Sequence, residues 1–119
     1  MNKTLVFGAS LKPERYGNLA IRRLVGNGFK TEAFGLRDGN IRGVKVNTNL
    51  DEFQDIHTIT LYLNPQRQKQ YYNNIIKLRP KRVIFNPGTE NPEFYKLLKE
   101  KNIEVQIACT LVLLATNQY

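Results

Sequence analysis

The sequence contains few of the residues that build disulfides, metal centres or membrane spans. It has one cysteine, Cys109, and one histidine, His57, in 119 residues. A single cysteine cannot form an internal disulfide, and one ligand of each kind is too few for a structural zinc site. No apolar run approaches the roughly 18 residues that a transmembrane helix needs, and the N-terminus has no signal-peptide pattern. We therefore expect a cytoplasmic protein without membrane contact or bound metal.

The sequence also lacks the patterns that are typical of an active site. His57 stands at the start of a predicted strand with no serine or aspartate motif beside it. The acidic cluster Asp51, Glu52 and Asp55 has no partner histidine and is explained as solvated charge. We expect no catalytic residues.

Acidic residues are in the minority: the sequence contains 10 of them and 18 lysines and arginines, which gives a formal charge of +8. This excess favours an anionic partner such as nucleic acid, a phosphorylated cofactor or an acidic protein. The cations are spread along the chain, so a solvated basic surface also explains them. The length and the 41% hydrophobic content suit one domain over residues 1–119 with a real core.

The stretch from Lys3 to Asn27 predicts a strand, a tight turn and a helix. The apolar run Thr4–Phe7 is too short for a helix, and the small residues Gly8-Ala9-Ser10 follow it directly. A polar segment with Lys12 and Arg15 then leads into an amphipathic helix after Gly17-Asn18. A strand, a glycine turn and a helix N-terminus create an anion site, because free N–H groups converge there with the helix dipole.

Strands and helices alternate along the remainder of the chain. Strands are predicted at Phe29–Phe34, Ile41–Asn47, Ile56–Leu63, Arg82–Phe85 and Ile103–Ile107, helices at Gln66–Arg79 and Glu93–Lys101, and a helical turn at Asn49–Phe53. This order indicates an α/β fold: a Rossmann-like, doubly wound, mostly parallel sheet of about five to six strands with helices on both faces. The apolar tail Leu111–Ala115 fits either a terminal helix on this sheet or a contact in a homo-oligomer.

Ligands of such sheets bind at the carboxyl ends of the strands. The loops there are Gly8–Arg15, Gly35–Asp38, Asn64–Pro65, Asn86–Glu90 and Ala108–Thr110. The first loop lacks the later glycines of the dinucleotide fingerprint, and Glu32 lies in the middle of its strand rather than at the tip. At the tip, Arg37 suits the additional phosphate of NADP or the 3′-phosphate of coenzyme A better than it suits NAD.

Several of these segments carry a family resemblance when they are taken in order. They are Val6–Ser10 with Lys12-Pro13, Gly43–Val46, Tyr62–Pro65, Asn86–Asn91 and Ala108–Val112. Together they resemble the stand-alone CoA-binding proteins, whose fold is similar to the CoA-binding domain of the succinyl-CoA synthetase alpha subunit. The family often has Asn-Pro-Lys after the second strand, whereas Gly35-Leu36-Arg37 stands here and lacks the proline.

The resemblance implies a non-catalytic module that binds coenzyme A or an acyl-CoA. By its motifs, Gly8, Ala9 and Ser10 would hold the pyrophosphate, and Lys12 and Arg15 would add positive charge beside it. Arg37 would meet the 3′-phosphate or the adenosine, and Asn64 and Pro65 would border the nucleotide. The crevice further along would be lined by Asn86, Pro87, Gly88 and Thr89.

Two other functions remain open at this point. An NADP-type or redox-sensing domain would use the same fold, and Arg37 does not separate it from a CoA-binding module. A basic nucleic-acid-binding protein would show binding that falls steeply with salt. That alternative is the weaker one, because Tyr71 and Tyr72 lie on a predicted helix rather than on a sheet face beside the cations.

Overall fold

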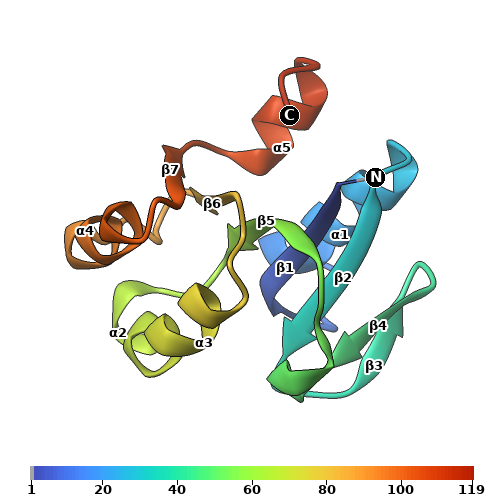
Figure 1. Cartoon of the computed structure of the whole chain (residues 1–119). Helices are drawn as coiled ribbons and strands as arrows, with labels where there is room; N and C mark the ends of the chain where they lie inside the picture. The colour runs from blue at the N-terminus through green and yellow to red at the C-terminus, as the bar shows by residue number, and fades with distance from the viewer. Residues whose placement is uncertain (1) are drawn as a thin grey trace.

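β1 (Lys3–Ala9) lies in the middle of a seven-stranded sheet in the computed structural model, which describes residues 2–119 (Figure 1). The strands follow the order β3-β4-β2-β1-β5-β6-β7, and every neighbouring pair is parallel except β3 with β4. The other strands are β2 (Lys30–Gly35), β3 (Gly39–Ile41), β4 (Val44–Asn47), β5 (Ile56–Leu61), β6 (Arg82–Phe85) and β7 (Glu104–Ile107). The predicted Rossmann-like α/β fold is confirmed, with seven strands instead of five to six.

The additional strand comes from a hairpin where one strand was predicted over Ile41–Asn47. The chain reverses between β3 and β4 at Arg42 (φ 51°) and Gly43 (φ 84°). Two successive residues with positive φ are typical of the type I′ turn, which joins two antiparallel strands. The prediction of one continuous strand was therefore wrong, and Gly43 is the residue that lets the chain turn.

Helices cover both faces of the sheet, as predicted. They are α1 (Tyr16–Gly26), α2 (Pro65–Gln68), α3 (Tyr72–Lys77), α4 (Pro92–Glu100) and α5 (Thr110–Ala115), with 3-10 turns η1 (Leu50–Glu52) and η2 (Lys69–Tyr71). Alternation along β1 sends Leu5 and Phe7 into a core with α3 and α4, and sends Val6 into a second core with α1 and α5. The apolar tail packs on its own sheet, because α5 buries Leu113 and Leu114.

The helix predicted at Gln66–Arg79 is interrupted. It consists of α2, the 3-10 turn η2 and α3, and Tyr71 leaves the helical region with φ −109° and ψ 1°. Tyrosine and asparagine, which fill positions 71 to 74, are weak helix formers, so tertiary packing decides the backbone there. The Tyr71 ring packs edge-on against Phe7 at 5.3 Å and against Phe34 at 5.5 Å between ring centroids.

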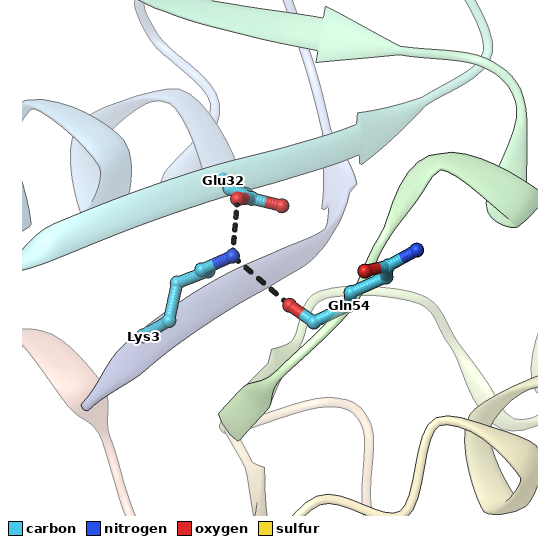
Figure 2. A network of polar contacts seen from close by, with 3 residues as sticks. All are labelled: Lys3, Glu32 and Gln54. Carbon is cyan, nitrogen blue, oxygen red and sulfur yellow. Dashed lines mark hydrogen bonds and ion pairs between the residues drawn. The ribbon is translucent and has the colours of Figure 1, made fainter. Parts of the chain in front are cut away.

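An ion pair joins the first two strands near their amino ends. Lys3 Nζ lies 2.9 Å from Glu32 Oε2 and also donates to the Gln54 carbonyl at 2.9 Å. Figure 2 shows these two contacts as dashed lines. Glu32 is therefore engaged in holding β1, β2 and the loop before β5 together. It lies away from the carboxyl edge of the sheet, where an acid that binds a ribose would stand.

Candidate functional site

The carboxyl edge of the sheet carries the candidate site. β1 lies between β2 and β5, so the chain leaves β1 toward one side of the sheet and returns later on the other side. Ligand crevices of open α/β sheets lie at such a switch point. Since β1, β2, β5, β6 and β7 run parallel, the five loops predicted from the sequence all lie along this one edge.

Two glycines bring the main chain together at the end of β1. Gly8 has φ +102°, and a Cβ there would lie 3.0 Å from the Leu63 side chain and 3.1 Å from the Tyr62 carbonyl carbon. A Cβ on Gly17 would lie 2.8 Å from the Gly8 carbonyl oxygen. The loop after β5 and the first turn of α1 therefore both press directly against the end of β1, and a side chain at either glycine would separate them.

The N-terminus of α1 has no side-chain cap. Arg15 stands at the cap position without a capping hydrogen bond, and the first turn contains no acidic residue. α4, the other long helix, is capped by Asn91 Oδ1, which accepts from the Phe94 N–H at 3.3 Å. Uncapped N–H groups and the positive end of the helix dipole together favour an anion at the start of α1.

Asn18 and Arg22 hold the loop between β1 and α1 in place. Asn18, buried in the first turn of α1, donates from Nδ2 to the Ser10 carbonyl at 2.9 Å and accepts from Arg22 Nε at 2.8 Å. Arg22 also donates to the Pro13 carbonyl at 2.8 Å. The sequence did not identify either residue as part of the site. The sequence signal, an Asn and an Arg spaced i and i+4 after a loop, is too common to identify a clamp.

Ser10 and the nearby cations remain open to a ligand. Ser10 Oγ accepts from the Lys12 N–H at 3.2 Å, which leaves its hydroxyl hydrogen for another acceptor. Lys12, Arg15 and Arg37 are exposed, and within residues 2–119 no side-chain hydrogen bond or ion pair engages their cationic ends. These two loops also carry the exposed acids Glu14 and Asp38, so three cations against two acids leave a net positive charge beside the uncapped helix.

Asn64 and Pro65 begin α2. Asn64 Oδ1 caps the helix by accepting from the Arg67 N–H at 2.9 Å, and Pro65 occupies the first helical position. Because the carboxamide of Asn64 is exposed, its NH₂ group faces solvent at the crevice edge. Both residues thus lie where the sequence placed them, and the cap explains the Asn-Pro pair without a ligand.

Asn86 and Thr89 are buried and hydrogen-bonded within the protein. Asn86 donates to Thr60 Oγ1 at 2.7 Å and to the Leu61 carbonyl at 2.9 Å, and it accepts from the Thr110 N–H at 2.8 Å. Thr89 Oγ1 donates to the Asn86 carbonyl at 2.7 Å. These two side chains are buried beneath the carboxyl edge of the sheet, whereas Pro87 and Gly88 between them are exposed.

A buried phenol lies beside this network. The Tyr62 hydroxyl has no hydrogen-bond partner among the described residues, and burial raises its pKa to about 12. Cys109, a half-buried free thiol, precedes α5 close to it. His57 lies elsewhere, at the amino end of β5, where burial and the charges of Arg82 and Lys81 lower its pKa.

Metal sites and membrane spans are not found over residues 2–119. No group of three or more His, Cys, Asp or Glu side chains there is placed to hold a metal ion, and no helix is long and apolar enough to cross a membrane. Two shallow grooves lie away from the predicted residues, one of about 540 Å³ along α4 and one of about 350 Å³ beside β4.

Comparisons with known proteins identify the family and show the same fold in solved structures. The family model described as the CoA binding domain matches residues 2–115. A crystal structure of an uncharacterized protein superimposes with a TM-score of 0.95 at 43% identity, covering 100% of this chain and 98% of the other. A structure from Thermus thermophilus gives a TM-score of 0.87 at 22% identity, covering 99% and 90% of the two chains.

A larger enzyme contains a similar fold. The dinucleotide-forming acetyl-coenzyme A synthetase 1 of Ca. Korarchaeum cryptofilum gives a TM-score of 0.72 at 16% identity, covering 87% of this chain but 25% of its own. The search of curated proteins gives no match. Because the family model spans nearly the whole chain, this protein belongs to the family of CoA binding domains.

Proposed function

We propose that this protein binds coenzyme A or an acyl-CoA along the carboxyl edge of its sheet and performs no chemistry on it. The single observation that carries the proposal is the uncapped N-terminus of α1 beside the Gly8–Ser10 turn. A pyrophosphate there would accept from the main-chain N–H groups of the first turn and from the Ser10 hydroxyl. Lys12 and Arg15 would add charge from the same loop.

The end of the second strand supports coenzyme A over NAD. An NAD site would need an acid at the tip of β2, but Glu32 is held by Lys3 and the exposed residue after Gly35-Leu36 is Arg37. A guanidinium at that place favours a phosphate on the ribose, as in the 3′-phosphate of coenzyme A. NADP also carries a ribose phosphate, so it is the ligand that competes with coenzyme A for this proposal.

The pantetheine arm would then extend away from β2, across the ends of β5 and β6. These two strands lie about 5 and 10 Å from β1 at ordinary strand spacing. Their loops present Asn64, Pro87 and Gly88 at the surface, with Pro65 half-buried. In this proposal Asn64 and Pro65 border the pantetheine arm, in place of the nucleotide that the resemblance implied. No nucleophile and base are hydrogen-bonded to each other at this edge within residues 2–119, which supports a binding role.

The experiment is a thermal-shift titration with coenzyme A, acetyl-CoA, NADP and NAD at about 150 mM salt, where exposed charges are well screened. A ligand at 100 times its dissociation constant adds about 2.7 kcal/mol of stability, which is roughly 10 °C for a domain of this size. We expect coenzyme A to raise Tm and NAD to leave it unchanged. A larger shift with NADP, or no shift with coenzyme A, would contradict the proposal.

A charge-matched pair of variants tests the location. Ser10→Asp places a carboxylate in the proposed phosphate loop and should abolish the coenzyme A shift. Asn102→Asp introduces the same charge at an exposed position before β7, at the amino edge of the sheet, and should leave the shift intact. Equal effects of the two variants would show that only net charge matters, as expected of a non-specific polyanion binder.

A further inference from the structure

Gln68 is a fully buried amide between the two loops that follow β5 and β6. It lies in α2 with 0% of its surface exposed. Its Nε2 donates to the Leu63 carbonyl and to the Thr89 carbonyl, both at 2.8 Å, and its Oε1 accepts from Asn91 Nδ2 at 2.8 Å. One side chain thus fixes a main-chain atom of each loop and uses both of its N–H donors to do so.

The orientation of this amide is set from both ends. Two carbonyl oxygens can only face an N–H donor, so the NH₂ end of Gln68 must point toward the loops. Asn91 uses its Oδ1 to cap α4, and its NH₂ therefore faces Gln68 and also Tyr72 Oη, at 2.7 Å. Tyr72 in turn donates to Glu93 Oε1 at 3.0 Å. Asn91 thus donates in two directions, to Gln68 on the side of the loops and to Tyr72 on the side of Glu93.

The loops that Gln68 joins carry the residues proposed to border the pantetheine arm. Leu63 directly precedes Asn64 and Pro65, and Thr89 directly follows Pro87 and Gly88. We infer that Gln68 is a positioning residue: it sets the spacing of these two loops and thereby the affinity for the pantetheine half of the ligand. This inference rests on the proposed function. The adenosine and phosphate half would lie on the loops after β1 and β2, to which Gln68 makes no side-chain hydrogen bond within residues 2–119.

This division between the two halves of the ligand makes the role testable. Gln68→Met keeps the size of the side chain and removes both donors and the acceptor. We expect the dissociation constant for coenzyme A to rise about tenfold, the effect of losing one or two buried hydrogen bonds. The constant for 3′-phospho-ADP, which is coenzyme A without pantetheine, should change by less than about threefold, because its loops keep their places.

Two further variants, measured by calorimetric titration with the same two ligands, separate positioning from stability. Leu98→Ala removes a fully buried side chain of α4 and should lower Tm without changing the ratio of the two dissociation constants. Asn91→Asp keeps an oxygen to cap α4 but removes the NH₂ group that Gln68 accepts from. It should raise the ratio of the dissociation constant for coenzyme A to that for 3′-phospho-ADP, as Gln68→Met does. If Gln68→Met does not fold, Asn91→Asp alone tests the positioning role.

The outcomes are distinct. Coenzyme A binding with a ratio that neither Gln68→Met nor Asn91→Asp moves would overturn this inference and leave the proposed function standing. A wild-type protein that binds neither coenzyme A nor 3′-phospho-ADP would overturn the proposed function and this inference with it. A ratio that rises equally in Leu98→Ala would show that the effect follows stability and would also overturn the inference.

Discussion

Replacing Asn86 by alanine should destabilise the protein far more than replacing Asn64, although the two residues look alike in the sequence. Each is an asparagine that follows a buried strand and precedes a proline. Asn86 is 1% exposed and makes three side-chain hydrogen bonds, whereas Asn64 is exposed and makes one, to the Arg67 N–H. The two substitutions therefore remove different amounts of structure.

The expected magnitude follows from the groups that are left unpaired. Asn86→Ala leaves the buried Thr110 N–H without its acceptor and removes the donor to the Leu61 carbonyl. Each unsatisfied buried group costs about 1–3 kcal/mol. We expect a total loss of about 3–5 kcal/mol in the free energy of unfolding, against about 1 kcal/mol for the exposed cap in Asn64→Ala.

Urea denaturation followed by far-UV circular dichroism measures both, since the chain has no tryptophan to report by fluorescence. With a slope of about 2 kcal/mol/M, the midpoint should fall by about 1.5–2.5 M for Asn86→Ala and by about 0.5 M for Asn64→Ala. A loss below about 1 kcal/mol for Asn86→Ala would refute the reasoning, because it would mean that the buried network does not hold the ends of β5, β6 and α5 together.

Three further predictions follow from single contacts. Tyr62→Phe removes a buried hydroxyl without a partner, so the free energy of unfolding at pH 7 should stay the same or rise by up to about 1 kcal/mol. In the wild type the raised pKa of Tyr62, about 12 when folded against 10.0 ordinarily, makes stability fall as the pH rises from 10 toward 12. Urea midpoints measured against pH should fall less steeply in Tyr62→Phe, which keeps the contributions of Tyr72 and Tyr119, whose pKa values burial also raises. Gly17→Ala places a Cβ 2.8 Å from a main-chain oxygen and should cost about 1–3 kcal/mol, whereas Gly26→Ala meets nothing within 4 Å and should be neutral or stabilising; equal melting temperatures would contradict this. Arg37→Gln should weaken coenzyme A about tenfold in calorimetric titration and leave dephospho-CoA unchanged, and equal losses for the two ligands would remove Arg37 from the 3′-phosphate.

The alternation of strands and helices was predictable because each element carries a strong local pattern. β6 occurs at Arg82–Phe85 as predicted, and a helical turn lies within Asn49–Phe53 as predicted. The sequence left Asn49 and Asp51 both open as its cap, and in the structure Asn49 accepts from the Asp51 N–H. These elements depend on apolar runs, prolines and caps within a few residues of one another. The hairpin at Arg42-Gly43 was missed because a glycine between Ile41-Arg42 and the apolar-polar alternation of Val44–Asn47 also fits one irregular strand.

The candidate site was also predictable from the sequence only in part. The turn at Gly8, the small residues after it and the helix beyond were predictable from local chemistry. The roles of Gln68, Asn18 and Asn86 were not, because a buried amide that joins distant main-chain atoms leaves no periodic signal in the sequence. Such residues look like ordinary surface polar residues until the partners are placed around them. Asn86 was assigned to the site from its motif, and the structure adds that its side chain is buried under the edge.

The most direct test of the central claim is a nuclear magnetic resonance titration of the ¹⁵N-labelled protein with coenzyme A. We predict that the largest amide shifts fall on the Gly8–Asn18 segment and on Leu36–Gly39, with smaller shifts at Leu63–Asn64 and at Gly88. The amides at the amino edge of the sheet, such as Gly43 and Asn102, should not move. Saturable shifts that centre on the amino edge, or no shifts at millimolar coenzyme A, would contradict the account.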